Sequence, residues 1–355
     1  MINKEELINK LNQYSRISLI SLPSPLTEMS NLGLESQNLR LFIKRDDLTG
    51  LAFGGNKSRK LEFIMADVLA KKADVAITWA SLQSNWCLQT AAAARKLGLK
   101  PILVLFKTYE LGEQVDGNIL LDFILGAEIH IKEAAKGKIV SLDEVAEVIE
   151  EVRLKTLKEG YNPYVVPIGG STPGFSMDLP LGAMAYVQAG LEIFDQLKEQ
   201  QVIPTWIVHA SGSGATQAGL VVAAKAVSPQ TKVMGICVSD PKKDFFPEVY
   251  QIAQETVAAL DLKISIAPED IILVDNYLGE GYGILTANIA QVIRLVAQQE
   301  GIFLDPVYTG KAMWALLDLI KQGYFHSGDR IVFIHTGGTA ALFPHRQGFL
   351  SFLTS

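Results

Sequence analysis

The stretch at residues 206–220 reads WIVHASGSGATQAGL, and it predicts a β-strand, a tight loop and the start of an α-helix. Apolar and β-branched residues from Trp206 to Ala210 indicate the strand, and the Gly and Ser residues that follow indicate the loop. Backbone N–H groups and the positive end of the helix dipole converge at such a helix start, so phosphate is the expected occupant. The alternative for a lone loop of this kind is a plain tight turn.

Two nucleotide-binding motifs do not fit this loop. A Walker loop requires Gly-Lys-Ser/Thr, and a dinucleotide loop requires glycine at the position of Gln217. We therefore expect a phosphate that is recognised through neither motif.

A second glycine-rich stretch, KRDDLTGLAFGGNKSRK at residues 44–60, places Lys57 just after the pair Gly54 and Gly55. Such glycines let the backbone turn sharply and let a bulky planar group approach the main chain. A lysine buried against that group can lose its proton and become a nucleophile for an aldehyde. The alternative is an exposed basic loop, because lysine side chains are mostly exposed.

Composition limits the classes of protein that fit. The chain has 355 residues, more than one core usually supports, so we expect two subdomains. A net charge of −6 argues against a nucleic-acid partner, and the two cysteines, Cys87 and Cys237, indicate a reducing compartment because they cannot form a disulfide framework. Residues 1–11 lack the apolar core of a signal peptide, and no apolar run reaches the roughly 20 residues that span a bilayer. We expect a soluble, cytoplasmic protein without a membrane partner.

Short apolar strands alternate with helical stretches along the chain, which is typical of parallel α/β architecture. The pattern predicts strands at 75–79, 101–106 and 164–168, a helix at 89–97, and a helix from a capping box at 141–144 to Gly160. Ser84 or Asn85 is the expected cap of the helix at 89–97. Ser84 then lies where a strand meets a helix, at the edge of the sheet that lines the ligand crevice in open α/β folds.

Eight patches, in this order and spacing, resemble the family of 1-aminocyclopropane-1-carboxylate deaminase and D-cysteine desulfhydrase, which are tryptophan-synthase-β-like pyridoxal-phosphate enzymes of fold type II. The patches are PSPL (23–26), IKRDDLT (43–49), GGNKSRKLEF (54–63), LQSN (82–85), GGS (169–171), GSGATQAGL (212–220), LDPVYTGKAM (304–313) and HTGG (335–338). The resemblance implies two three-layer α/β domains with parallel sheets and the cofactor, pyridoxal 5′-phosphate, between them. We expect a large domain formed by residues 1–52 and 165–355 and a small domain at 53–164.

The resemblance also implies roles for individual residues. Lys57 matches the lysine that binds the cofactor covalently, and Lys60 matches a second lysine that neutralises the phosphate. Ser84 and its loop are expected at the substrate carboxylate, with Ser84 placed to assist proton transfer at Cα, and Tyr282 and Tyr308 match two site tyrosines. Without the resemblance each tyrosine would be an ordinary half-buried aromatic. Further cofactor contacts are expected from Asn85, Ser211, Gly212, Ser213, Gly214, Ala215, Thr216 and Thr309, and further substrate contacts from Gln83, Asn85 and Trp86.

Two positions distinguish the subfamilies. The ring-opening deaminases carry Glu and Leu where this chain has Thr309 and Thr336, and both threonines match the desulfhydrase type. A threonine leaves the pyridine nitrogen less cationic than a carboxylate does, which suits elimination of a good leaving group. Trp86 and Leu88 depart from the family, which usually has His or Gln and then Arg at these positions.

The sequence therefore predicts a pyridoxal-phosphate-dependent lyase that removes HX from a β-substituted amino acid. D-cysteine is the first candidate substrate, giving pyruvate, ammonia and hydrogen sulfide. Deamination of 1-aminocyclopropane-1-carboxylate, elimination from L-cysteate, racemisation, and cofactor binding without turnover are the alternatives. The resemblance implies a homodimer, and no metal site is expected.

Overall fold

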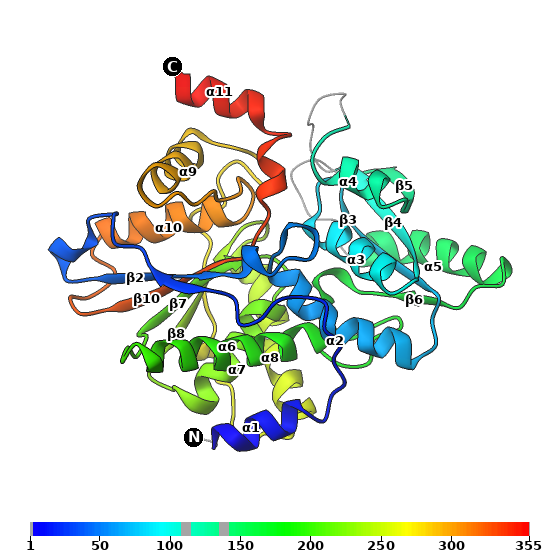
Figure 1. Ribbon diagram of the computed structural model, residues 1–355, viewed down its shortest axis with the longest axis horizontal. Coiled ribbons are helices and arrows are strands. Elements are labelled where there is room, and N and C mark those ends of the chain that lie inside the picture. The colour runs from blue at the N-terminus through cyan, green and yellow to red at the C-terminus, as the bar shows by residue number, and fades with distance from the viewer. Residues whose placement is uncertain (1–2, 108–114, 135–141, 355) are drawn as a thin grey trace.

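The larger of two sheets forms one half of the molecule (Figure 1). The computed structural model describes residues 3–107, 115–134 and 142–354. Within them, the larger sheet has the strand order β1-β2-β10-β7-β8-β9, in which β1 is antiparallel to β2 and the other neighbours are parallel. Its strands are β1 (Leu26–Glu28), β2 (Arg40–Arg45), β7 (Trp206–Ser211), β8 (Lys232–Cys237), β9 (Ile272–Val274) and β10 (Arg330–His335).

The smaller sheet is parallel throughout and has the order β5-β4-β3-β6. Every residue of β3 is buried, as expected for a parallel strand covered on both faces. The strands are β3 (Val75–Ser81), β4 (Lys100–Lys107), β5 (Glu128–Glu133) and β6 (Pro163–Val165). We propose the division into two domains, near residues 53 and 165, that the sequence predicts.

Helices cover the sheets and place the loops between them. Figure 1 shows α6, α7 and α8 on one face of the larger sheet and α9 and α10 on the other, with α2 leading from the larger sheet toward the smaller one. Each of the described helices is too short or too polar to cross a membrane. The helices are α1 (Lys4–Leu11), α2 (Asn56–Ala70), α3 (Asn85–Lys96), α4 (Asn118–Ile124), α5 (Leu142–Lys158), α6 (Leu181–Glu199), α7 (Ala215–Val227), α8 (Lys242–Ala259), α9 (Ala287–Glu300), α10 (Thr309–Lys321) and α11 (Arg346–Thr354).

Most elements predicted from the sequence are present. The predicted strands 75–79 and 101–106 lie within β3 and β4, and Ser84 is the cap of α3, where its Oγ accepts from the N–H groups of Trp86 and Cys87. The strand predicted at 164–168 ends at Val165, because Pro167 has no N–H to donate and the chain turns into a 3-10 helix at Ile168–Gly170. Ser141, the predicted cap of α5, lies outside the described residues.

Candidate active site

A cavity of about 430 Å³ lies where strands of both sheets end. Ser81 ends β3, Ser211 ends β7, and Thr336 directly follows β10, and all three line the cavity. In open α/β sheets the carboxyl ends of strands form the ligand crevice. The cavity is therefore where a ligand is expected from the topology alone.

Lys57 enters this cavity from the second position of α2. Its Nζ donates to Asn56 Oδ1 at 3.1 Å and lies 5.8 Å from the centre of the Tyr308 ring. Burial lowers the pKa of Lys57 to about 8, and the charge of Asp305 opposes that shift. A lysine with this pKa has a substantial neutral fraction near physiological pH, which is the form that attacks an aldehyde.

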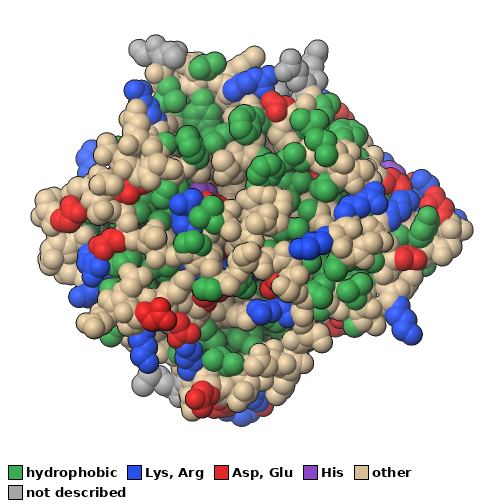
Figure 2. All heavy atoms as spheres, viewed as in Figure 1, with side chains coloured by type: hydrophobic (Ala, Val, Ile, Leu, Met, Phe, Trp, Pro, Cys, Tyr) green, Lys and Arg blue, Asp and Glu red, His purple; other side chains and the backbone are tan. Residues whose placement is uncertain are grey.

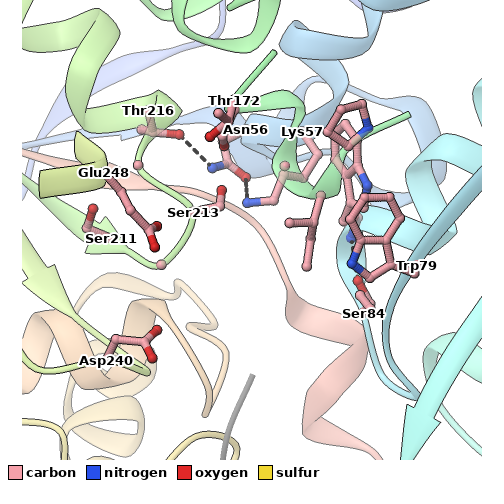
Figure 3. A pocket seen from close by; sticks show the side chains of 18 of the residues that line it. Asn56, Lys57, Trp79, Ser84, Thr172, Ser211, Ser213, Thr216, Asp240 and Glu248 are labelled. Atoms are coloured by element: carbon pink, nitrogen blue, oxygen red, sulfur yellow. Dashed lines mark hydrogen bonds between the residues drawn. The ribbon is translucent and has the colours of Figure 1, made fainter. Parts of the chain in front are cut away.

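Asn56 connects Lys57 to Thr216, the second residue of α7, directly after the loop of residues 211–214. Its Oδ1 accepts from Lys57, and its Nδ2 donates to Thr216 Oγ1 at 3.1 Å (Figure 3). The residue is 5% exposed and lines the cavity. Sequence reasoning did not include Asn56 among the site residues, and the available signal was its place directly before Lys57.

The loop itself forms as the sequence predicts, between β7 and the first residue of α7. Gly214 has a φ of 80°, in the left-handed region that favours glycine. Ser211 Oγ donates to Gln217 Oε1 at 2.9 Å, and Gln217 Nε2 donates to Ile272 O. The Ser211 hydroxyl therefore stabilises the loop through a contact within the protein. This contact gives Gln217 a structural role at the position where a dinucleotide motif requires glycine.

The site contains a buried hydroxyl that fits a phosphate ligand. Ser171 is 4% exposed, lines the cavity, and has no hydrogen-bond partner on its Oγ among the described residues. A Cβ built on Gly169 would lie 3.0 Å from Ser171 Oγ and 2.1 Å from Ser213 Oγ, so both hydroxyls gather beside this glycine. Lys60 Nζ donates to Gly169 O at 3.1 Å, on the same short segment. Hydroxyls, helix N–H groups and a nearby lysine form a donor set that suits the phosphate of pyridoxal phosphate.

Burial lowers the pKa of Lys60 as it lowers that of Lys57. Lys60 is fully buried, with its Nζ 5.8 Å from the centre of the Tyr186 ring. Burial lowers its pKa well below the ordinary value, and the charge of Lys57 lowers it further. A bound anion would favour the charged form of both lysines.

Some residues at the start of α3 line the cavity, and others bond to α4. Ser84 and Trp86 line the cavity, whereas Gln83 and Asn85 are not among its described lining residues. Gln83 Oε1 accepts from Asn118 N at 2.7 Å, and Asn85 Oδ1 accepts from Asn118 Nδ2 at 2.8 Å. Asn118 on α4 thus fixes the loop that presents Ser84.

Two tyrosines meet at the wall of the cavity. The hydroxyls of Tyr282 and Tyr308 are 2.5 Å apart, and Tyr282 Oη lies 3.4 Å from Ser81 Oγ. Burial raises the pKa of Tyr282, so its hydroxyl stays protonated near neutrality. The pair is placed to donate and relay a hydrogen bond rather than to carry a charge.

The two threonines that distinguish the subfamilies have different positions. Thr336 lines the cavity. Thr309 is fully buried at the start of α10, where its Oγ1 donates to Asp305 Oδ1 at 2.7 Å and accepts from Asp305 N at 2.8 Å. Asp305 also accepts from the N–H groups of Val307 and Tyr308, both at 2.9 Å.

The structure brings most of the predicted site residues to one cavity. Those that line it are Lys57, Ser84, Trp86, Ser211, Gly212, Ser213, Gly214, Thr216, Tyr282, Tyr308 and Thr336. Those that are not among its described lining residues are Lys60, Gln83, Asn85, Ala215 and Thr309. The cavity adds Trp79, Phe175, Asp240 and Glu248, which no local motif in the sequence indicated, and Ser171, which ends the GGS patch at 169–171 but was given no role there.

Known proteins share this arrangement along nearly the whole chain. The family described as "Pyridoxal-phosphate dependent enzyme" matches residues 17–337. The D-cysteine desulfhydrase of Klebsiella pneumoniae subsp. pneumoniae is 40% identical over 341 residues, which are 95% of this chain and 98% of that protein. A crystal structure described as an ACC deaminase homologue has a TM-score of 0.86 at 36% identity and covers 99% of this chain and 100% of its own. The processed form of threonine deaminase isoform 2 from Solanum lycopersicum shares the fold, with a TM-score of 0.63 at 17% identity over 99% of this chain and 89% of that chain.

These matches cover both sheets and the cavity between them, and they agree with the chemistry of a buried lysine beside a phosphate-type loop. The chain belongs to the pyridoxal-phosphate-dependent enzyme family that includes D-cysteine desulfhydrase and the ACC deaminase homologue, and it is itself a pyridoxal-phosphate-dependent enzyme.

Proposed function

We propose that the protein is a lyase that catalyses α,β-elimination from D-cysteine or a similar β-substituted amino acid, giving pyruvate, ammonia and hydrogen sulfide. The observation that carries the proposal is the placement of Lys57, with its pKa lowered to about 8, in one cavity with Ser84 and the Tyr282–Tyr308 pair. A module that only bound the cofactor would need the lysine and the phosphate loop but not these hydroxyls. The likeness to a D-cysteine desulfhydrase supports the same reading.

Lys57, Asn56 and the loop of residues 211–214 would hold the cofactor, together with Ser171 and Thr216. When bound, pyridoxal phosphate supplies an electron sink for the electrons left at Cα. Lys57 would hold the cofactor covalently, and its amine, when free, would remove or return the proton at Cα. Its lowered pKa suits that role near neutral pH.

Ser84 would bind the carboxylate of the substrate. Its Oγ already accepts from two backbone N–H groups, those of Trp86 and Cys87, so its own hydrogen remains to be donated. The first N–H groups of α3 add the positive end of a helix dipole at the same place. Tyr282 and Tyr308 would donate to the leaving sulfur, because burial keeps Tyr282 protonated.

Thr336 supports elimination over ring opening. It places a neutral hydroxyl at the cavity, and the resemblance puts leucine at this position in the ring-opening deaminases. The second threonine, Thr309, directs its hydroxyl to Asp305, so it also brings no charge to the cavity. The likeness to an ACC deaminase homologue keeps ring opening as the second candidate.

The test is a substrate panel with the purified holoenzyme. We expect pyruvate and sulfide from D-cysteine, slower or no release from L-cysteine, and no 2-oxobutanoate from 1-aminocyclopropane-1-carboxylate. Ser84→Ala should lower turnover by about 100-fold or more, while Ser36→Ala, at an exposed serine that donates to Gly33 O and is not among the described lining residues of the cavity, should leave it unchanged. Efficient 2-oxobutanoate formation would reverse the assignment, and racemisation without pyruvate would replace the lyase by a racemase.

We also propose a cytoplasmic homodimer. The two cysteines, Cys87 and Cys237, are buried and free, which suits a reducing compartment. Phe123 and Ile124 of α4 are 50% and 72% exposed, and Phe343 is 64% exposed before α11. Figure 2 shows hydrophobic side chains gathered at this end of the molecule. Light scattering of the purified protein, with Ile124→Ser as the disrupting variant, tests whether this surface joins two copies.

A further inference from the structure

The cavity has two chemically different ends. Figure 3 shows Ser211, Ser213, Asp240 and Glu248 on one side of Lys57 and Trp79 with Ser84 on the other. The first end carries the hydroxyls of the phosphate-type loop and two acidic side chains. Trp79 at the second end packs against Phe175, and Trp86, Pro167, Ile168 and Pro173 are further apolar residues that line the cavity. Because Ser84 lies at this second end, the part of the substrate beyond its carboxylate faces an apolar wall.

Trp86 presents only carbon to the cavity. Its Nε1 donates to Thr78 Oγ1 at 2.8 Å, and Thr78 Oγ1 donates in turn to Val166 O at 2.8 Å. The indole N–H is the one polar group of tryptophan, so this chain of hydrogen bonds removes it from any ligand. The side chain is 2% exposed, and a Cβ built on Gly170 would lie 3.4 Å from its ring, so the indole is fixed in place.

Phe175 closes the same end from the rim. Its ring meets the Trp79 ring edge to face, with centroids 5.5 Å apart and an interplanar angle of 66°. Phe175 has a φ of 53°, a left-handed conformation that is rare and costly for a bulky residue. Paired hydrogen bonds between Gly174 and Met177 hold the turn that imposes it. The side chain is 42% exposed, so this turn holds an aromatic ring at the mouth of the cavity.

The charged residues that line the cavity do not favour an anionic substrate group at the second end. Among the described residues that line the cavity, Lys57 is the sole lysine or arginine, and its amine is assigned to the cofactor and to the proton at Cα. Asp240 and Glu248 add negative charge to the other end. A sulfonate or carboxylate placed against Trp79 and Phe175 would lose its hydration without gaining a charged partner there, whereas an apolar substituent would bury its surface against the same rings.

We propose that the aromatic end is a subsite for an apolar group on the substrate sulfur, so that the preferred substrates are S-alkyl or S-benzyl cysteines rather than free cysteine or cysteate. The proposal rests on the elimination proposed above. The Cα–H and Cβ–S bonds break, and the sulfur leaves with the electron pair of the Cβ–S bond and takes a proton to give a thiol. The remaining three-carbon enamine takes up one water to give pyruvate and ammonium.

The first arm of the test measures turnover by holoenzyme of D- and L-cysteine, S-methylcysteine, S-benzylcysteine and cysteate, with pyruvate as the common product. We expect kcat/KM for S-benzylcysteine to exceed that for free cysteine of the same hand by about tenfold or more, and cysteate to be inert. Phe175→Ala should lower the ratio of the S-benzyl value to the value for free cysteine by about tenfold. The control is Phe303→Ala, which removes a phenyl ring that is 59% exposed and absent from the described lining of the cavity.

The second arm measures binding without turnover. The ligands are 3-(benzylthio)propanoate, 3-mercaptopropanoate and 3-sulfopropanoate, which lack an amino group and cannot react with the cofactor. Calorimetry with holoenzyme should give tightest binding for the benzyl ligand, with quenching of tryptophan fluorescence, and weakest for the sulfonate. Binding of the sulfonate as tight as that of the benzyl ligand, or equal effects of Phe175→Ala and Phe303→Ala, overturns the subsite. If no substrate yields pyruvate, the proposed elimination fails, and the binding series still decides the subsite.

Discussion

Lys57 and Arg59 lie two residues apart on α2, Lys57 partly buried at the cavity and Arg59 fully buried, and their charges have opposite surroundings. Arg59 Nη2 donates to Asp46 Oδ1 and Glu192 Oε1, each at 2.8 Å, and to Ser24 Oγ at 2.9 Å. No carboxylate of the described residues lies within ion-pair distance of Lys57, whose amine donates to the Asn56 amide oxygen.

The difference appears in the pKa of each group. Burial disfavours the charge of Arg59, but the carboxylates of Asp46 and Glu192 outweigh it and raise the pKa of Arg59 above its ordinary value. Burial lowers the pKa of Lys57 to about 8, with only the charge of Asp305 to oppose it. A buried cation with partners holds elements together, and a buried amine without a carboxylate is prepared to lose its proton. On one helix, therefore, one cation supports the structure and the other is available for chemistry.

The largest expected effect comes from Lys57→Ala. Turnover should fall by about three orders of magnitude or more, because no other amine among the described lining residues of the cavity replaces the covalent attachment. Borohydride reduction of the native holoenzyme should label Lys57, as shown by peptide mass spectrometry. The variant should unfold at the same or a higher temperature than the cofactor-free native enzyme, since it removes a buried amine that lacks a carboxylate. A label on Lys60 instead would contradict the comparison.

Arg59→Met should act on stability. It leaves Asp46 buried without its charged partner, which costs about 3–5 kcal/mol in the free energy of unfolding. Arg153→Met is the matched control, because Arg153 pairs with Glu150 on a surface where the two side chains are 31% and 44% exposed. That exposed pair contributes about 1 kcal/mol or less. Denaturant unfolding of both variants decides the matter, and equal losses would show that the pairing of Arg59 is not structural.

The hydroxyls at the phosphate-type loop also fall into two groups, those expected to bind the cofactor and one that bonds within the protein. Replacing both Ser213 and Thr216 by Ala should weaken cofactor retention by about 1.5–3 kcal/mol for each charge-assisted hydrogen bond lost. Ser211→Ala should change retention far less, because this hydroxyl donates to Gln217. Absorbance of the bound cofactor after dialysis measures the loss. Equal losses from the double variant and Ser211→Ala would remove the distinction.

Local chemistry explains how much of this could be predicted. The strand-loop-helix at 206–220 and the cap at Ser84 were predictable, because glycine conformations and capping hydrogen bonds depend on residues close in sequence. The contact between Asn56 and Thr216 was not, since it joins residues 160 positions apart. The anchor of Trp86 on Thr78 depends on how α3 packs beside β3, and no motif encodes that packing.

The hydrogen-bond partner of Thr309 in the candidate site could not be predicted from the sequence either. Its position in the chain matches a cofactor-contacting residue of the family, and the structure gives its hydroxyl two hydrogen bonds to Asp305. A motif records which residue stands at a position, whereas the partner of a hydroxyl depends on competing acceptors nearby. The role of Thr309 toward the cofactor stays a prediction.

The smallest expected effect is a pH dependence that separates Lys57 from an ordinary lysine. A pKa lowered to about 8 means that the neutral amine rises from about one tenth of the molecules at pH 7 to about nine tenths at pH 9. The rate at which cofactor-free enzyme binds pyridoxal phosphate covalently should therefore rise about ninefold over this interval and then become constant. An unperturbed lysine, with a pKa near 10.4, would instead gain about tenfold for each pH unit up to pH 9 and about sevenfold from pH 9 to pH 10. Stopped-flow absorbance measures the rate, with Nα-acetyl-lysine as the reference amine. A rate that still climbs about sevenfold between pH 9 and pH 10 would mean that burial does not lower the pKa of Lys57, and the contrast with Arg59 would reduce to the ion pairs alone.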